Sequence, residues 1–343
     1  MSKKAGWGIL AAALIVMLGV AAMTGGAGHK ENEAPTSIRI GVALYRDDDT
    51  FISTLREQLE RCAKDYEQSG DVKVNLDIYG AKGSQITQNS QVERFISLDC
   101  DVLCVNIVDR AAASSIIDKA MAADTPVVFF NREPVEEDMN RWEKLYYVGE
   151  DAKTSARIQG QIVVDEWKKE PALLDRNGDG VVGYVLLEGE TSHQDSLIRT
   201  EWSIQTLKNG GVPLKKITGG IGNWERTQGS ALMEQWLKNY PGEIELVVSN
   251  NDDMALGAID AIKRMETKEK IQIVGIDGTP PALEAVEARD LLGTVQCDGE
   301  KYAKAIFDIS AALALHEDVN SVINLDEGKY YRCPQISKKF NSN

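Results

Sequence analysis

The 343-residue sequence is short of positive charge. It carries 38 Lys and Arg residues against 53 Asp and Glu residues, a formal net charge of −15, and its basic residues gather only in doublets such as Lys3-Lys4 and Lys215-Lys216. Because nucleic-acid binding draws on clustered Lys and Arg, this deficit argues against a nucleic-acid partner. We expect the acidic surface mainly to keep the protein soluble.

Cysteine is scarce and shows no motif. The five cysteines form no CxxC pair and have no histidines at metal-ligand spacing; they are Cys62, Cys100, Cys104, Cys297 and Cys333. A disulfide framework is not expected in a chain of this length. We expect free, mostly buried thiols, because cysteine in an apolar run behaves as a small hydrophobic residue.

The N-terminus carries a targeting signal. Lys3 and Lys4 precede an apolar run from Trp7 to Met23, and a polar Gly-rich stretch follows. We interpret residues 1–28 as a secretory signal peptide or a single membrane anchor, followed by a linker over residues 29–37. Either cleavage or retention is compatible with the sequence. Both place the rest of the chain outside the cytoplasm.

The remaining sequence predicts two α/β domains. Its length suits two domains of about 150 residues. Short Val- and Ile-rich runs alternate with helical patterns, which is typical of parallel sheets with helices on both faces. The runs predicted as strands are 38–45, 72–78, 102–107, 127–130, 184–187, 215–221, 246–249, 271–276 and 293–296. Such sheets bind ligands at the carboxyl ends of their strands.

Polar and aromatic residues follow these predicted strands at several successive positions. They are Asp49, Phe51, Asn131, His193, Asp195, Arg199, Trp224, Asn251 and Asp277. Carboxylates, amides, an imidazole and a guanidinium together supply the donors and acceptors that hydroxyl groups require. Aromatic rings such as Phe51 and Trp224 pack on the C–H faces of a pyranose. The set therefore predicts a monosaccharide site.

Each of these residues also has a purely structural interpretation. Asp49 and Asn251 could cap the helices that follow them. His193 could be structural, and Trp224 could belong to a core. Arg199 and Asp195 could form a surface pair at i, i+4 spacing. Their joint occurrence at strand ends is what favours a binding site.

At these residues the sequence resembles the type I periplasmic sugar-binding protein family, and within it the members that bind D-galactose and D-glucose. The resemblance extends from residue 39 to about Pro334 and is carried by segments 39–45, 48–51, 106–109, 127–134, 146–149 and 249–252. It implies that the nine residues bind a hexose, with Phe51 and Trp224 on either side of the ring. One position departs from the family pattern: Cys297 stands where an asparagine precedes the aspartate, here Asp298.

The resemblance further implies a hinge of three crossing segments, near Gly149–Glu150, Cys297–Asp298 and Gly328–Lys329. The N-terminal domain would then comprise residues 38–149 and 298–328, and the C-terminal domain residues 150–297 and 329–343. Closure around a sugar would produce the form that a membrane ABC permease, and in some relatives a chemoreceptor, reads. We expect a monomer.

The segment 175–181 has the spacing of a calcium loop. Asp175, Asn177 and Asp179 occupy positions 1, 3 and 5, Gly180 the turn, and Val181 the position of a carbonyl ligand. An EF-hand would require an acid at position 12, where Leu186 stands. The resemblance supplies the acid as Glu245, while position 9 is Gly183. We expect a structural Ca²⁺; a turn without metal is the alternative.

Other classes of protein are compatible with parts of this sequence. The aspartates could in principle serve glycoside hydrolysis, but carboxylates beside Arg and amides suit hydroxyl binding better, so no enzyme is expected. A transcription repressor of the same fold would begin with a basic DNA-binding segment, which is missing. A membrane-tethered sugar sensor, or a protein for ribose or xylose, stays open. The sequence does not distinguish glucose from galactose.

Overall fold

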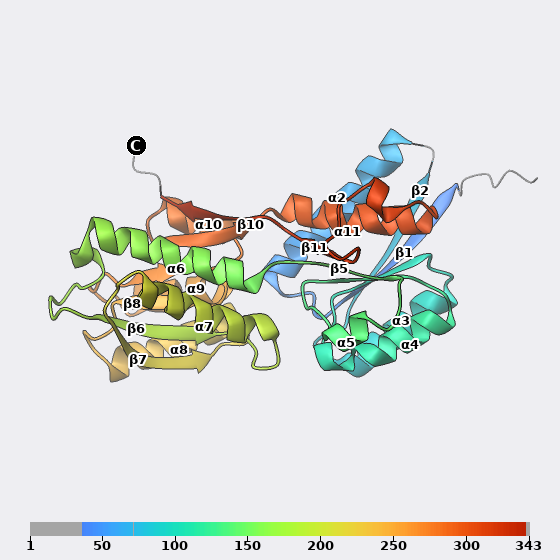
Figure 1. Ribbon diagram of the computed structural model, residues 1–343. Coiled ribbons are helices and arrows are strands. Elements are labelled where there is room, and N and C mark those ends of the chain that lie inside the picture. Colours follow the sequence, from blue (N-terminus) through green and yellow to red (C-terminus); the bar gives the residue numbers. More distant parts are fainter. Residues whose placement is uncertain (1–35, 71, 341–343) are drawn as a thin grey trace, which may run out of the picture. The chain divides into compact units, whose positions relative to one another are not determined.

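Two six-stranded sheets organise the chain, and the computed structural model describes residues 36–70 and 72–340 (Figure 1). Both sheets belong to one unit of the chain that begins at Thr36. The proposed signal peptide or anchor, residues 1–28, and most of the linker lie outside the described residues. Within the described residues, no helix is both long and apolar enough to cross a membrane.

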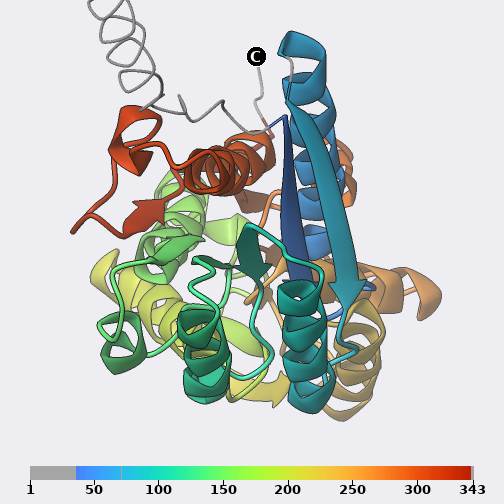
Figure 2. The same ribbon diagram turned by 90° about the vertical axis from the view of Figure 1, so that its right-hand side faces the viewer.

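The first sheet has the order β11-β5-β4-β3-β1-β2, and all its neighbouring strands are parallel. Its strands are β1 (Ser37–Leu44), β2 (Lys73–Gly80), β3 (Val102–Val105), β4 (Val127–Phe130), β5 (Leu145–Gly149) and β11 (Tyr330–Arg332). In Figure 2 the long blue strands β1 and β2 run side by side, as their eight-residue register requires.

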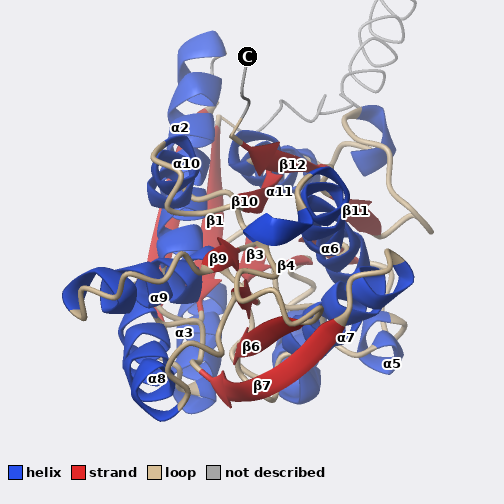
Figure 3. Cartoon of the chain, turned by 90° about the vertical axis from the view of Figure 1, so that its left-hand side faces the viewer, coloured by secondary structure: helices blue, strands red, loops and turns tan. Residues whose placement is uncertain are grey.

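The second sheet has the order β12-β10-β9-β8-β6-β7. Its strands are β6 (Val182–Glu188), β7 (Leu214–Ile221), β8 (Leu246–Ser249), β9 (Gln272–Val274), β10 (Gly293–Cys297) and β12 (Gln335–Lys339). Figure 3 shows β6 and β7 side by side at one edge. Strand β12 at the other edge is antiparallel to β10. The expectation of a wholly parallel sheet is therefore wrong at this edge.

Helices cover both faces of each sheet. The first sheet packs against α2 (Thr50–Ser69) and α11 (Gly299–Ala314) on one face and against α3 (Gln85–Ser97) and α4 (Ala113–Ala122) on the other. The second packs against α8 (Arg226–Asn239) and α9 (Asp252–Arg264), and against α6 (Ala152–Lys169) and α7 (Gln194–Asn209). The shorter helices are α5 (Glu136–Met139), α10 (Pro280–Glu287), η1 (Arg110–Ala112), η2 (Pro171–Leu173) and η3 (Val319–Ser321).

The central strands explain why these sheets are covered on both sides. Strands β3, β4 and β8 read VLCV, VVFF and LVVS, and every residue in them is buried. A strand without a polar face must bury both faces, which requires helices above and below the sheet. The structure thereby confirms the predicted fold class of two doubly wound α/β domains.

The chain crosses between the sheets three times. The first crossing lies between Gly149 and α6, and the second at Cys297–Asp298, between β10 and α11. The third was expected near Gly328–Lys329, and this is wrong. Residues Tyr330–Arg332 form β11, which pairs with β5 in the first sheet. The crossing therefore lies at Cys333–Pro334, and residues 329–332 belong to the first domain.

We refer below to residues 36–149 and 299–332, without residue 71, as the first lobe, and to residues 150–297 and 334–340 as the second lobe.

The sequence analysis did not predict β5, β11 and β12 as strands. Strands β11 and β12 are polar edge strands whose sequences, YYR and QISKK, show no buried alternation. Strand β11 is stabilised by pairing with β5, and β12 by pairing with β10.

Candidate binding site

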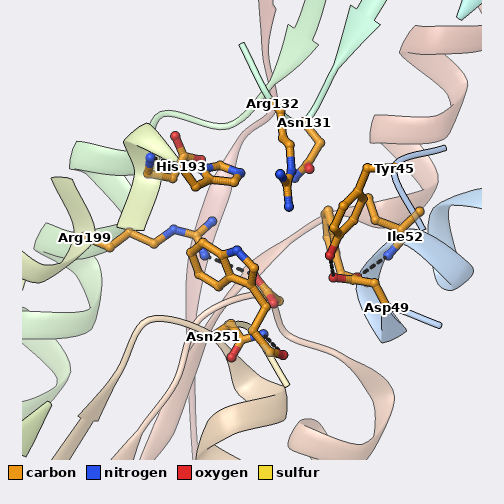
Figure 4. A pocket seen from close by; sticks show the side chains of 12 residues that line it. Tyr45, Asp49, Ile52, Asn131, Arg132, His193, Arg199 and Asn251 are labelled. Carbon is orange, nitrogen blue, oxygen red and sulfur yellow. Dashed lines mark hydrogen bonds and ion pairs between the residues drawn. The ribbon is translucent and has the colours of Figure 1, made fainter. Parts of the chain in front are cut away.

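One pocket collects all nine residues that were singled out from the sequence. Its lining also includes Tyr45, Ile52 and Arg132, and its cavity volume is about 40 Å³ (Figure 4). The first lobe supplies residues that follow β1 and β4, and the second lobe supplies residues that follow β6, β7, β8 and β9. The pocket thus lies at the carboxyl ends of the strands of both sheets.

Asp49 has two roles on the first-lobe side. Its Oδ1 accepts a hydrogen bond from the backbone amide of Ile52 at 2.9 Å and so caps α2. Its Oδ2 accepts the hydroxyl hydrogen of Tyr45 at 2.5 Å (Figure 4). Burial, together with the Asp49 charge, raises the pKa of Tyr45. The capping interpretation is therefore correct, and it fixes the carboxylate at the pocket wall.

Arg132 is a pocket residue that the sequence analysis missed, although it directly follows Asn131. Its guanidinium lies 3.9 Å from the centre of the Tyr45 ring, a cation–π distance. Two of its nitrogens contact the carboxylate of Glu190 in the second lobe at 3.0 Å. Arg132 therefore forms part of the pocket wall and joins the two lobes.

Two further side-chain contacts join the lobes near the pocket. Thr50 Oγ1 donates to Asp253 Oδ2 at 2.7 Å, and Arg46 donates to Glu225 Oε1 at 2.9 Å. The residues on the first-lobe side follow β1, and those on the second-lobe side follow β7 and β8. The lobes are thus in contact around the pocket.

Arg199 organises the second-lobe wall. It is 5% exposed and donates to the carbonyl of Asn250 at 2.9 Å, to Asp277 Oδ1 at 3.3 Å and to Glu150 Oε2 at 3.1 Å. These carboxylates raise the pKa of Arg199 against the opposing effect of burial. The surface pair of Arg199 with Asp195 is therefore wrong, because Arg199 is a buried charge with two other carboxylate partners.

His193 and Trp224 form a corner of the same wall. His193 Nδ1 accepts the backbone amide of Asp195 at 3.1 Å and caps α7. Burial lowers the pKa of His193 well below 6.5, and the charges of Arg132 and Arg199 lower it further, so the imidazole is neutral. The two rings meet edge to face, with centres 5.1 Å apart. Trp224 is a core residue and a pocket residue at once.

Backbone strain accompanies three of the pocket residues. Asn131, Trp224 and Asp277 have φ values of 63°, 67° and 124°, which residues other than glycine rarely adopt. Gly189 makes room for the Trp224 ring, since a Cβ at Gly189 would lie 2.2 Å from it. Strain of this kind, held by the surrounding structure, is typical of functional sites.

The remaining predicted residues have defined places. Asn251 caps α9 by accepting the amide of Met254 at 3.0 Å, and its Nδ2 donates to the Trp224 carbonyl at 3.1 Å. The ring of Phe51 lies edge to face with that of Tyr302, with ring centres 5.9 Å apart. Cys297 is not among the residues lining this pocket. Its thiol is buried beside Glu150 and Cys333.

The loop expected to bind calcium is held by its own carboxylates. Asp175 accepts the amides of Gly178 and Gly180, and Glu245 accepts those of Arg176, Asn177 and Gly183, at 2.8–3.0 Å. Asn177 and Asp179 accept the amides of Asp179 and Val181. Among the described residues, no group of three or more His, Cys, Asp or Glu is arranged to hold a metal ion.

The glycine at position 9 of this loop has a steric cause. A Cβ on Gly183 would lie 2.1 Å from the carbonyl oxygen of Glu243, so no larger residue fits there. The oxygen donors of Asp175, Asn177, Asp179, Val181 and Glu245 are chemically suited to Ca²⁺. Glu245 is 1% exposed, and its carboxylate is hydrogen-bonded to the loop.

Comparison with known proteins identifies the class of protein. The periplasmic binding protein domain family matches residues 40–318, and the chain belongs to this family. It is 38% identical over 277 residues to the D-galactose/methyl-galactoside binding periplasmic protein MglB of Haemophilus influenzae, covering 80% of this chain and 81% of that protein.

More distant relatives also align with most of this chain. The ribose import binding protein RbsB of Bacillus subtilis is 25% identical over 294 residues, covering 84% of this chain and 87% of that protein. A solved ABC transporter solute binding protein from Bacillus halodurans, with bound myo-inositol, superimposes with a TM-score of 0.72 at 27% identity. That match covers 90% of this chain and 96% of the other.

The buried carboxyl group of Asp195 makes the stability of the fold depend on pH. Burial raises its pKa to about 6, with Glu150 and Glu133 adding to the rise and Arg199 opposing it. Because this pKa lies above the unfolded value, ionised Asp195 destabilises the fold at neutral pH, and its protonation relieves that cost as the pH falls from about 6 towards 4. Asp195→Asn should therefore raise the free energy of unfolding at pH 7.5 by about 2 kcal/mol.

Affinity of the pocket for a hydroxylated ligand should fall as the pH falls, whereas the cost of Asp195 to stability is relieved. An ionised carboxylate accepts hydrogen bonds at both oxygens, so ligand affinity measured by calorimetry should fall between pH 7.5 and pH 5 in the wild type. Asp195→Asn should bind more weakly at pH 7.5 and lose most of this pH dependence. An equal pH dependence in both proteins would show that another group titrates.

Proposed function

We propose that this protein is an extracytoplasmic solute-binding protein that captures galactose or glucose between its two lobes. It would deliver the sugar to a membrane ABC permease, without chemical change. The single observation that carries the proposal is the pocket itself, which combines residues of both lobes in the set that the sequence analysis linked to hexose binding. The relative at 38% identity, described as galactose-binding, supports the choice of sugar.

The division of roles within the pocket follows from side-chain chemistry. Phe51 and Trp224 line it from different lobes, so a flat pyranose between them would touch both lobes with its two C–H faces. Asp49, Asp195 and Asp277 would accept hydroxyl hydrogens, while Arg199 and the amides of Asn131 and Asn251 would donate. Neutral His193 has one N–H to give, because Nδ1 is already an acceptor.

Ligand capture would work through hinge closure. A sugar that contacts both lobes favours the closed arrangement by its differential affinity for the two states. The permease would recognise the closed form, and a chemoreceptor could read the same surface. The N-terminal segment would export the protein and could retain it at the membrane.

A panel of sugars tests the proposal. Calorimetric titration with glucose, galactose, ribose, xylose and myo-inositol should give micromolar dissociation constants for a hexose, since about eight polar contacts contribute about 1 kcal/mol each. Trp224→Ala should weaken hexose binding about tenfold or more. Trp142→Ala, outside the pocket, is the matched control. Tighter binding of ribose or myo-inositol than of any hexose would contradict the assignment.

We also propose a structural Ca²⁺ in the loop formed by residues 175–181 together with Glu245. The three carboxylates among its donors would have their mutual repulsion offset by the ion. Adding Ca²⁺ at 100 times its dissociation constant should stabilise the fold by about 2.7 kcal/mol.

Thermal unfolding with and without a chelator measures the calcium effect. The midpoint should fall on chelation in the wild type, while Asp179→Asn should respond less or only at higher Ca²⁺. Asp77→Asn, a carboxylate in the other lobe, serves as the control. An unfolding midpoint of the wild type that is indifferent to Ca²⁺ would favour the alternative of a turn without metal.

A further inference from the structure

The three crossing segments meet at one buried cluster of side chains. Glu150 follows β5 on the first crossing, Cys297 ends β10 on the second, and Cys333 follows β11 on the third. Cys297 and Cys333 are each 4% exposed and belong to the same core cluster as Tyr302. The binding site described above uses neither thiol.

Backbone pairing holds these segments in register. Strands β10 and β12 are antiparallel, with Cys297 opposite Gln335, two residues beyond Cys333. The amide of Cys333 donates to the Gly149 carbonyl at 2.8 Å, and Gln335 Nε2 donates to Glu150 Oε2 at 2.9 Å. The two cysteines therefore lie on neighbouring segments whose positions are fixed by hydrogen bonds.

The two thiols lie in one core cluster, on neighbouring segments. The neighbouring Cys333 side chain, burial and the nearby Glu150 carboxylate raise the pKa of Cys297. The two cysteines therefore lie side by side within the hinge.

The other cysteines are not arranged in this way. Cys100 and Cys104 are close in sequence but belong to core clusters on opposite faces of the first sheet. The Cys104 sulfur contacts Ser310 Oγ at 3.1 Å. Cys62 lies on α2 and is partly exposed. Cys297 and Cys333 are accordingly the pair that the fold brings together.

We propose that Cys297 and Cys333 form a reversible disulfide that links the second and third crossing segments and restricts opening of the hinge. An external low-molecular-weight or protein disulfide is the oxidant. One cysteine thiolate attacks it and releases one external thiol; the second cysteine then displaces the other external thiol. Two electrons and two protons leave the cysteine pair, and the external disulfide becomes two thiols.

The restriction follows from where the cysteines lie. Hinge closure and opening are absorbed by backbone rotations in a few residues of the crossing segments. The lobes are in contact in this arrangement, through Thr50 with Asp253 and Arg132 with Glu190. A covalent bond formed here adds a constraint between two of the three segments and favours that contact.

The location of the protein decides whether the bond can persist. Disulfides survive in oxidising compartments outside the cytoplasm and are reduced within it. This step rests on the proposed extracytoplasmic function, whereas the placement of the two thiols on neighbouring segments of one core cluster does not. A test of the bond is therefore independent of a test of sugar binding.

The experiment compares the full chain in reduced form and after incubation with oxidised glutathione. Peptide mapping should find a Cys297–Cys333 cross-link that dithiothreitol reverses, leaving three of the five cysteines open to alkylation in the unfolded protein. Cys62→Ser should form the same cross-link, and Cys297→Ser and Cys333→Ser should not. If either serine variant fails to fold, the corresponding alanine variant takes its place.

Hydrogen exchange measures the restriction of opening. The amides of residues 149–152, Cys333 and Gln335 should exchange about tenfold more slowly in the oxidised protein, a change of about 1.4 kcal/mol in the opening free energy. Neither change should occur in Cys297→Ser. The absence of the cross-link, a cross-link between other cysteines, or unchanged exchange in the cross-linked protein would each overturn the proposal. Glucose titration of the reduced protein tests the proposed function separately.

Discussion

The guanidinium of Arg199 is the interaction on which the second-lobe wall depends. It contacts Glu150 on the first crossing segment, Asp277 after β9 and the carbonyl of Asn250 after β8, and it is almost completely buried. Without it, two buried carboxylates would lack their counter-charge, and removing one partner of a buried ion pair typically costs about 3–5 kcal/mol. One side chain therefore joins three segments that are distant in the sequence and connects the pocket to the hinge.

The same charge balance shapes the chemistry of the pocket. Burial raises the pKa values of Asp195 and Asp277, while Arg199 lowers them. Burial, together with the charges of Arg132 and Arg199, keeps His193 neutral. Helix caps fix the orientations of the pocket side chains, since Asp49, His193 and Asn251 each bind the first turn of a helix. A wall that is held in place before a ligand arrives loses less conformational freedom on binding.

The sequence was sufficient for the fold and for most of the candidate site, because both follow from local patterns. Buried strands such as VVFF require covered sheets, and the polar residues after them meet at one edge. Tyr45 was counted as the end of a strand, and Arg132 was hidden beside Asn131. Glu150 was noticed only as a hinge residue. Its pairing with Arg199 spans 49 positions, and no local pattern reports such a contact. The third crossing was misplaced because β11 gains its stability from pairing with β5 rather than from its own sequence.

The most direct test of this account is the position of a bound sugar, measured by crystallography of the protein with glucose. The account predicts one pyranose between the rings of Phe51 and Trp224, with its hydroxyl groups bonded to Arg199 and to the carboxylates around it. Ordered glucose at another site, or an empty pocket at a glucose concentration that saturates binding in solution, would contradict it.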